Sequence, residues 1–116
     1  MSYETDKGYR GERTVRDFYL SSGLPCVRPR TTSRTDTDVG DVTGPPWVTS
    51  VKNHRRMDLA GWVDELGHMV RRAELGTGIV VHHRVGRARP DDWYVTTTLG
   101  LAVPLLWTYA RYGGRP

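Results

Sequence analysis

The chain has 116 residues, a size that fits one domain built around one hydrophobic core. Its net charge of +4 is compatible with a polyanionic partner but does not select one. Cys26 is the single cysteine, which excludes an internal disulfide framework and a multi-cysteine zinc site, and we expect a buried structural thiol. No apolar run approaches the roughly 18 residues that span a bilayer, and the N-terminal segment is polar. We therefore expect a cytoplasmic protein without a membrane partner.

Helical spacing of apolar residues predicts a first helix over residues 9–21. Val15 and Tyr19 lie on its apolar stripe, and Glu12 falls on the edge of the same face. A carboxylate at such an edge costs desolvation free energy unless a cation or a donor satisfies it. Glu12 is therefore either an inward-facing functional acid or one half of a salt bridge with Arg16 at the next turn.

A first strand is predicted from about Cys26, and it runs into a basic segment rich in Thr and Ser. The arginines of this segment are candidates for phosphate contacts. The alternative is a solvated run of charge, which is the commoner outcome for such a stretch. These arginines are Arg28, Arg30 and Arg34.

The next segment predicts a hairpin, with strands over 39–44 and 47–53 on either side of a Pro-Pro turn. If the two prolines are the loop residues, Asp41 lies opposite Ser50. Residues two apart on a strand share a face, so Asp41, Ser50 and Lys52 project together in this register. A slip of one residue would break the arrangement.

The clearest helix follows Asp58, a good N-cap, and has a continuous apolar stripe, with Asp64 and Glu65 on its exposed face. A strand rich in β-branched residues over 78–85 is expected at the centre of the sheet. Its adjacent histidines, His82 and His83, point to opposite faces and cannot bind one metal together.

A last strand over 93–98 and a helix over 101–113, with Pro104 in its first turn, complete the chain. The element order α-β-β-β-α-β-β-α predicts an α/β fold with a mixed central sheet of about five strands flanked by helices. We expect a single domain over residues 1–116, with a flexible start (1–7) and a C-terminal tail (113–116).

All but two of the seventeen basic residues are arginines, and the exceptions are Lys7 and Lys52. The compact ammonium of Lys52 can approach a phosphate as a point charge, whereas the planar guanidinium suits another geometry. Carboxylates that converge at a sheet edge can bind Mg²⁺, which prefers oxygen ligands. Such an ion lowers the pKa of bound water and neutralises charge on a phosphate under attack. A nearby lysine can stabilise the transition state.

Four segments match a known family in order: GERTVRDFYLSSG, DVGDVTG, SVKN and DLAGWVDE. The chain resembles the PD-(D/E)xK nuclease superfamily, and most closely its small Holliday junction resolvases of archaea and bacteriophages. The resemblance covers about residues 8–96. No single motif is highly specific, because an acid–turn–xK hairpin also occurs by chance, and the combination of the four is more informative. It implies a restriction-endonuclease-like core.

The resemblance implies that Glu12 and Asp41 are metal-binding acids and that Lys52 is the catalytic lysine. It also implies a Mg²⁺-dependent endonuclease, with Mn²⁺ able to substitute, that cuts branched DNA such as a four-way junction. Such enzymes are usually homodimers, so that two strands can be cut, and a bacteriophage enzyme would act in the host cytoplasm. The candidate DNA-binding residues are Lys7, Arg10, Arg28, Arg30, Arg34, His54, Arg55 and Arg56.

The departure from the family pattern is Ser50, where the family has Glu or Asp and sometimes Gln. Three accounts stay open: another acid, with Asp38 the nearest candidate, supplies the missing ligand; Ser50 holds a metal-bound water in a weaker site; or the site is attenuated and only DNA binding is kept. The alternative function is accordingly a catalytically inactive DNA-binding module on the same fold. A third hypothesis is an unrelated small basic α/β domain in which Asp41 and Lys52 are a cross-strand surface pair.

Overall fold

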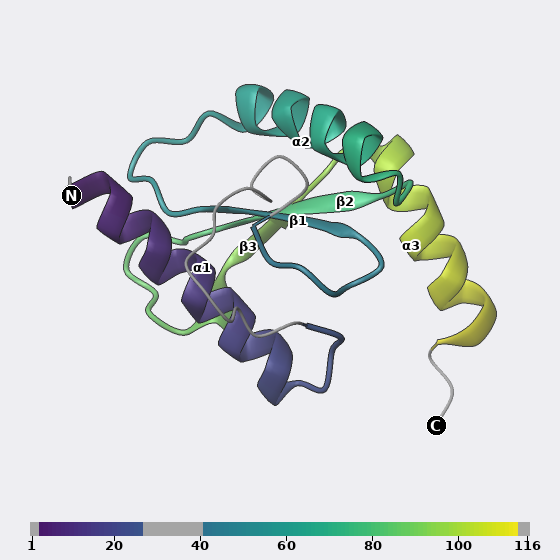
Figure 1. Ribbon diagram of the computed structural model, residues 1–116, viewed down its shortest axis with the longest axis horizontal. Helices are drawn as coiled ribbons and strands as arrows, with labels where there is room; N and C mark the ends of the chain where they lie inside the picture. The colour runs from purple at the N-terminus through teal and green to yellow at the C-terminus, as the bar shows by residue number, and fades with distance from the viewer. Residues whose placement is uncertain (1–2, 27–40, 114–116) are drawn as a thin grey trace.

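The computed structural model describes residues 3–26 and 41–113, with three helices, three strands and one short 3₁₀ helix among them (Figure 1). The protein has an α/β fold. In chain order the elements are α1 (Tyr3–Ser21), β1 (Val48–Lys52), α2 (Leu59–Ala73), β2 (Gly78–His82), η2 (Pro90–Asp92), β3 (Tyr94–Thr96) and α3 (Leu99–Tyr112).

The three strands form one mixed sheet in the order β1-β2-β3. β1 and β2 are parallel, with Val48 beside Gly78 at one end and Lys52 beside His82 at the other. β3 is antiparallel to β2. β2 is therefore central, as its run of β-branched residues predicts, and α2 is the crossover that parallel strands require.

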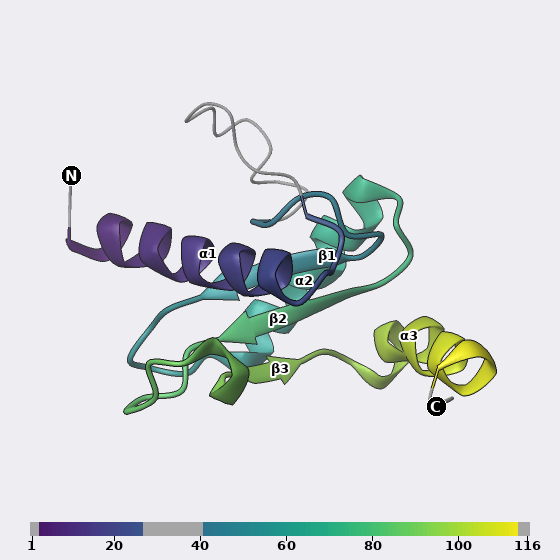
Figure 2. The same cartoon turned by 90° about the horizontal axis from the view of Figure 1, so that it is seen from below.

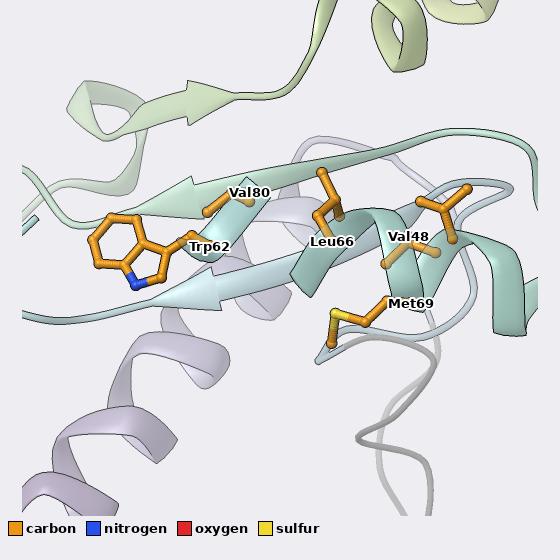
Figure 3. Packing of buried hydrophobic residues seen from close by; sticks show 6 residues of the cluster. Val48, Trp62, Leu66, Met69 and Val80 are labelled. Carbon is orange, nitrogen blue, oxygen red and sulfur yellow. The ribbon is translucent and has the colours of Figure 1, made fainter. Parts of the chain in front are cut away.

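Helices cover both faces of the sheet, and each face has its own core (Figures 1 and 2). The face toward α2 buries side chains of α2 against Val48 and Val80, as Figure 3 shows for Trp62, Leu66 and Met69. The opposite face packs against α1. Its buried cluster comprises Val15, Tyr19, Val42, Val51 and Val81.

The sequence signals for α2 are confirmed. The Asp58 carboxylate accepts a hydrogen bond from the Gly61 amide at 3.2 Å and caps the helix. Behind the helix, Gly78 begins β2 at a point where a side chain would not fit. An added Cβ there would lie 2.9 Å from both Val48 Cβ and Val70 Cγ2. The absence of a side chain thus lets α2 lie directly on the sheet.

α1 begins six residues before the predicted start, so the helix includes part of the segment expected to be flexible. It approaches β1 closely at Gly11, where an added Cβ would lie 3.0 Å from Asn53 Cβ. Farther along, the Tyr19 hydroxyl and Thr49 Oγ1 share a buried hydrogen bond of 2.9 Å. Glycine at the close approach and the buried hydroxyl pair both hold α1 against β1.

The predicted hairpin is wrong in the described residues, because Asp41–Trp47 contains no strand. Two prolines in this segment lack amide donors, and Gly44 has a φ of +113°. β1 instead pairs in parallel with β2. The segment nevertheless keeps Asp41 beside β1, through a backbone hydrogen bond of 2.8 Å from its amide to the Thr49 carbonyl.

The sheet has three strands within the described residues, where the sequence predicts about five. The predicted first strand falls mostly in residues 27–40, which lie outside the described residues. β3 is shorter than the predicted strand over 93–98. α3 begins two residues before its predicted start because Thr98 caps it, which moves Pro104 from the first turn into the helix interior.

α3 lies at the end of the sheet where β1 and β2 begin, and it extends away from the other elements (Figures 1 and 2). Leu101 packs against the core on the α2 side, and its carbonyl accepts a hydrogen bond from the hydroxyl of Thr77, the residue before β2. Within residues 3–26 and 41–113, no helix has the length and apolarity needed to cross a bilayer.

Candidate functional site: the carboxyl end of the parallel strands

Polar and charged residues gather where the parallel strands β1 and β2 end. Lys52 and His82 are the last residues of the two strands and lie side by side in the register. Ligands of open α/β sheets bind outside the carboxyl ends of parallel strands, because the loops that follow those ends converge there. This end of the sheet is therefore the first place to look for a functional site.

Lys52 forms an ion pair with Glu65 of α2. The distance from Lys52 Nζ to Glu65 Oε1 is 2.8 Å, and the two side chains are 16% and 50% exposed. Glu65 lies beside the buried stripe of α2, one residue before Leu66, so its carboxylate can reach the end of β1. Residues alternate in direction along a strand, so Lys52, Ser50 and Val48 all face α2.

Asp41 lies along the edge of β1 opposite to the edge that pairs with β2. Its amide donates to the Thr49 carbonyl, and its Oδ2 accepts a hydrogen bond of 2.6 Å from the Val51 amide. Asp41 thus forms hydrogen bonds to the backbone of the two residues on either side of Ser50. The predicted neighbourhood of Asp41 and Ser50 is present, although loop residues rather than a paired strand produce it.

Two buried polar atoms on the α2 face have no hydrogen-bond partner within the described part of the chain. They are Ser50 Oγ and His82 Nδ1. Ser50 is fully buried and His82 is 3% exposed. Unpaired buried polar atoms are uncommon in native proteins, and each calls for an explanation such as a functional role or a bound water.

His82 is a buried residue at the end of β2. Burial lowers its pKa, because the charged imidazolium would lose its hydration. Its Nε2 shares a hydrogen bond of 2.8 Å with Thr96 Oγ1. The ring lies between Trp62 and Tyr94, with centroid distances of 5.3 Å to each. His54 also stacks on Trp62, with ring centroids 5.8 Å apart, so several aromatic rings gather beside the end of β1.

The loop after β2 presents further arginines at this end. Its turn is closed by a backbone hydrogen bond from Arg87 to Arg84, with Gly86 at a φ of +84°. The Arg87 carbonyl also accepts hydrogen bonds of 3.0 Å from His83 Nε2 and Trp93 Nε1. These bonds fix the loop, and the guanidinium of Arg84 lies 5.4 Å from the centre of the Tyr94 ring.

The predicted DNA-binding residues that the structure describes lie near the same end. Asn53 Nδ2 donates to the Lys7 carbonyl at 2.8 Å, which joins the first half of α1, with Arg10, to the end of β1. The loop that follows contributes three exposed side chains. These are His54, Arg55 and Arg56. Arg28, Arg30 and Arg34, and the candidate metal ligand Asp38, lie outside the described residues.

Glu12 belongs to the helix on the other side of the sheet from α2. It is a half-buried residue of α1, the helix that covers the face opposite to Glu65 and Ser50. Its suggested salt-bridge partner, Arg16, lies 3.7 Å from Asp17. In the described ranges no three His, Cys, Asp or Glu side chains are grouped closely enough to hold a metal ion.

Two features of the site are not predicted from the sequence. Glu65 is expected on the exposed face of its helix, which agrees with its exposure, but its contact with Lys52 is not expected. The available signal was its position one turn after Trp62, at the edge of the apolar stripe. The loop arginines Arg84 and Arg87 were likewise not predicted, although they follow the central strand directly.

Comparison of the chain with protein-family models, with curated proteins and with solved structures finds no match. The proposed function therefore rests on the geometry of the carboxyl end of the sheet and on the sequence motifs.

Proposed function

We propose that the protein is a divalent-metal-dependent DNA endonuclease whose active site lies at the end of β1. The observation that carries the proposal is the ion pair between Lys52 and Glu65, on the face where Ser50 stands in the place of an acid. Glu65 supplies a carboxylate that the strand itself lacks. Asp41 supplies a second one at the edge of β1 that faces away from β2, where its Oδ2 accepts from the Val51 amide next to the same serine.

In this proposal the Mg²⁺ site would use two carboxylates. Magnesium in phosphoryl-transfer sites is commonly held by one or two carboxylates, and waters and substrate phosphate oxygens complete its shell. Glu65 and Asp41 can provide those carboxylates without a three-residue cage. When bound, the ion would neutralise charge on the phosphate and lower the pKa of water. Mn²⁺, with similar ligand preferences, is expected to substitute.

The chain's own residues have separate roles in this proposal. Lys52 places a positive charge near the scissile phosphate, where charge develops in the transition state, and Glu65 holds the ammonium at the end of the strand. The basic loops after β1 and β2 bind the DNA backbone and position it. The buried His82 and its aromatic neighbours form the floor of the site. Glu12, on α1 at the opposite face of the sheet, has no role in this proposal.

Branched DNA, with a four-way junction as the model substrate, is the proposed target. The resemblance of the sequence motifs to Holliday junction resolvases supports this choice, as does the excess of positive charge. The five-strand restriction-endonuclease-like core, the homodimer and the cytoplasmic location belong to the same proposal.

The test is cleavage of a synthetic four-way junction and of a linear duplex, with Mg²⁺ or Mn²⁺. We expect the wild-type chain to cut the junction in preference to the duplex. Lys52→Ala and Glu65→Gln should each lower the cleavage rate at least about 100-fold, a typical loss when one electrostatic contact to a transition state is removed. Asp64→Asn is the matched control, because Asp64 is the neighbouring exposed acid of α2, and it should retain the wild-type rate.

A double variant tests whether Glu65 takes the place of the missing strand acid. Ser50→Glu in the Glu65→Gln background should recover part of the activity, provided that circular dichroism shows a folded chain. Junction binding without cleavage by the wild type would favour the alternative, an inactive DNA-binding module. Binding should weaken steeply with salt if phosphate contacts dominate. Neither binding nor cleavage, or full activity in Lys52→Ala, would contradict the proposal.

A further inference from the structure

α3 is an apolar helix that the other described residues, 3–26 and 41–98, leave exposed. None of its residues is buried, and Arg111 is its only charged side chain. Leu99 is 76% exposed, Leu106 58% and Trp107 56%. A helix that is apolar on all sides is normally buried. This surface therefore calls for a partner that covers it.

The apolar residues on the exposed side of α3 are spaced as in a helix that pairs with another helix. Leu99, Val103, Leu106 and Ala110 follow one another at intervals of four, three and four positions, and all four are exposed. This is the spacing of the core positions of a coiled coil. The small Ala110 allows a second helix to approach closely, and the large ring of Trp107 flanks the row.

The size of the exposed apolar surface is a large part of what one subunit contributes to an interface. The exposed parts of Leu99, Val103, Leu106, Trp107 and Tyr109 amount to on the order of 500 Å², since large apolar side chains have about 150–250 Å² of surface each. That is as large as the biggest apolar patch of a typical monomer, roughly 300–600 Å². It is also a major share of the roughly 800 Å² that each partner contributes to a stable complex.

We infer that α3 is a self-association surface, on which α3 of a second copy of this chain packs in the antiparallel direction. The segment from Leu99 to Ala110 contains no charge, so two copies can meet there without opposing like charges in a protein of net charge +4. The partner's row of apolar residues has the same spacing by identity. A two-fold axis between Val103 and Leu106 pairs the two rows along their whole length, with Leu99 opposite Ala110 and Val103 opposite Leu106.

A groove beside the start of α3 fits this orientation. It has a volume of about 440 Å³ and lies between α2 and α3. An antiparallel partner brings the C-terminal half of its own α3, with Trp107, to this end of the helix. The groove offers apolar contacts and a polar rim to that ring. Its lining residues include Val63, Gly67, Val70, Leu101, His68 and Arg71.

The interface does not depend on the proposed nuclease function. α3 lies at the amino end of β1 and β2. Lys52 and His82 are the last residues of those strands and lie at the opposite end of the sheet. Association through α3 thus leaves the basic end accessible, whatever that end binds.

Sedimentation equilibrium of the full chain over a range of concentrations tests the inference. We expect a dimer for the wild type and at least a tenfold higher dissociation constant for Leu106→Glu, since a charge replaces a central apolar contact. Thr108→Glu is the matched control, because Thr108 is an exposed residue of α3 outside the row, and it should stay dimeric. Thermal unfolding by circular dichroism should show all chains folded.

Disulfide trapping tests the orientation, in a Cys26→Ser background because Cys26 is the only native cysteine. Antiparallel pairing predicts that a chain with Leu99→Cys cross-links to a chain with Ala110→Cys in preference to another copy of itself. A wild-type chain that stays monomeric at all concentrations would overturn the inference, as would a Leu106→Glu variant that dimerises like the wild type. Monomers that bind lipid vesicles through α3 would overturn the choice of occupant.

Discussion

α2 and α3 are helices of nearly equal length with the same kind of start, and they differ completely in burial. Each begins with a side-chain cap, from Asp58 in α2 and Thr98 in α3. α2 carries four acidic or basic residues and still buries Trp62, Leu66, Met69 and Val70. α3 is much more apolar and buries none.

The difference shows that segregation, rather than apolar content, decides how a helix is used. The buried residues of α2 recur at helical spacing on one side, and its charges lie on the other, so the helix has one way to lie on the sheet. α3 offers apolar residues all around and has only a short sheet end to pack against. Its surplus of apolar surface is left for an association outside this chain.

The largest expected difference between the two helices is in the cost of removing a leucine. Leu66→Ala should lower the free energy of unfolding by about 3–4 kcal/mol, because Leu66 is fully buried and its loss leaves a cavity. Leu106→Ala, at an exposed position, should change it by at most about 0.5 kcal/mol in dilute monomer. Urea unfolding measures both. Equal losses would show that α3 is part of the core.

Glycine substitutions give a smaller effect of opposite sign in the two regions. Gly78→Ala should destabilise the chain by about 1–3 kcal/mol, because the new methyl group would press on Val48 and Val70 beneath α2. Gly100→Ala in α3 should be neutral or should stabilise the helix by up to about 1 kcal/mol. The nearest atom to its new Cβ is Thr98 Oγ1 at 4.0 Å. Thermal unfolding of both variants checks the pair, and a stable Gly78→Ala chain would contradict the close packing.

The smallest effect is a pH dependence confined to the α2 side. Burial lowers the pKa of His82, so the unfolded chain binds its proton more readily than the folded chain. The free energy of unfolding should therefore fall as the pH drops below about 6.5, the ordinary pKa of histidine, and level off below the folded-state pKa. His82→Gln should reduce this slope. The control His68→Gln, at an exposed position of α2, should keep it, and an unchanged slope in His82→Gln would assign the effect to other groups.

Local signals in the sequence predicted α2, the central strand β2 and the opposite directions of His82 and His83. Each depends on neighbours a few positions away: a cap, a helical stripe, a β-branched run, the two-residue period of a strand. The predicted hairpin failed because its pairing rested on a turn of two prolines, whose missing donors and restricted backbone do not support a two-residue loop. Asp41 still lies beside Ser50, because the chain between them is short.

The sequence by itself determined the α/β class, the helix that begins after Asp58 and the unusual pair of Ser50 and Lys52 two positions apart. Only the tertiary structure decided that Lys52 meets Glu65, that Glu12 lies on the other face, and that α3 is left uncovered. These outcomes depend on which helix covers which face of the sheet. That choice follows from the parallel pairing of β1 with β2, a contact between distant segments that no local pattern specifies.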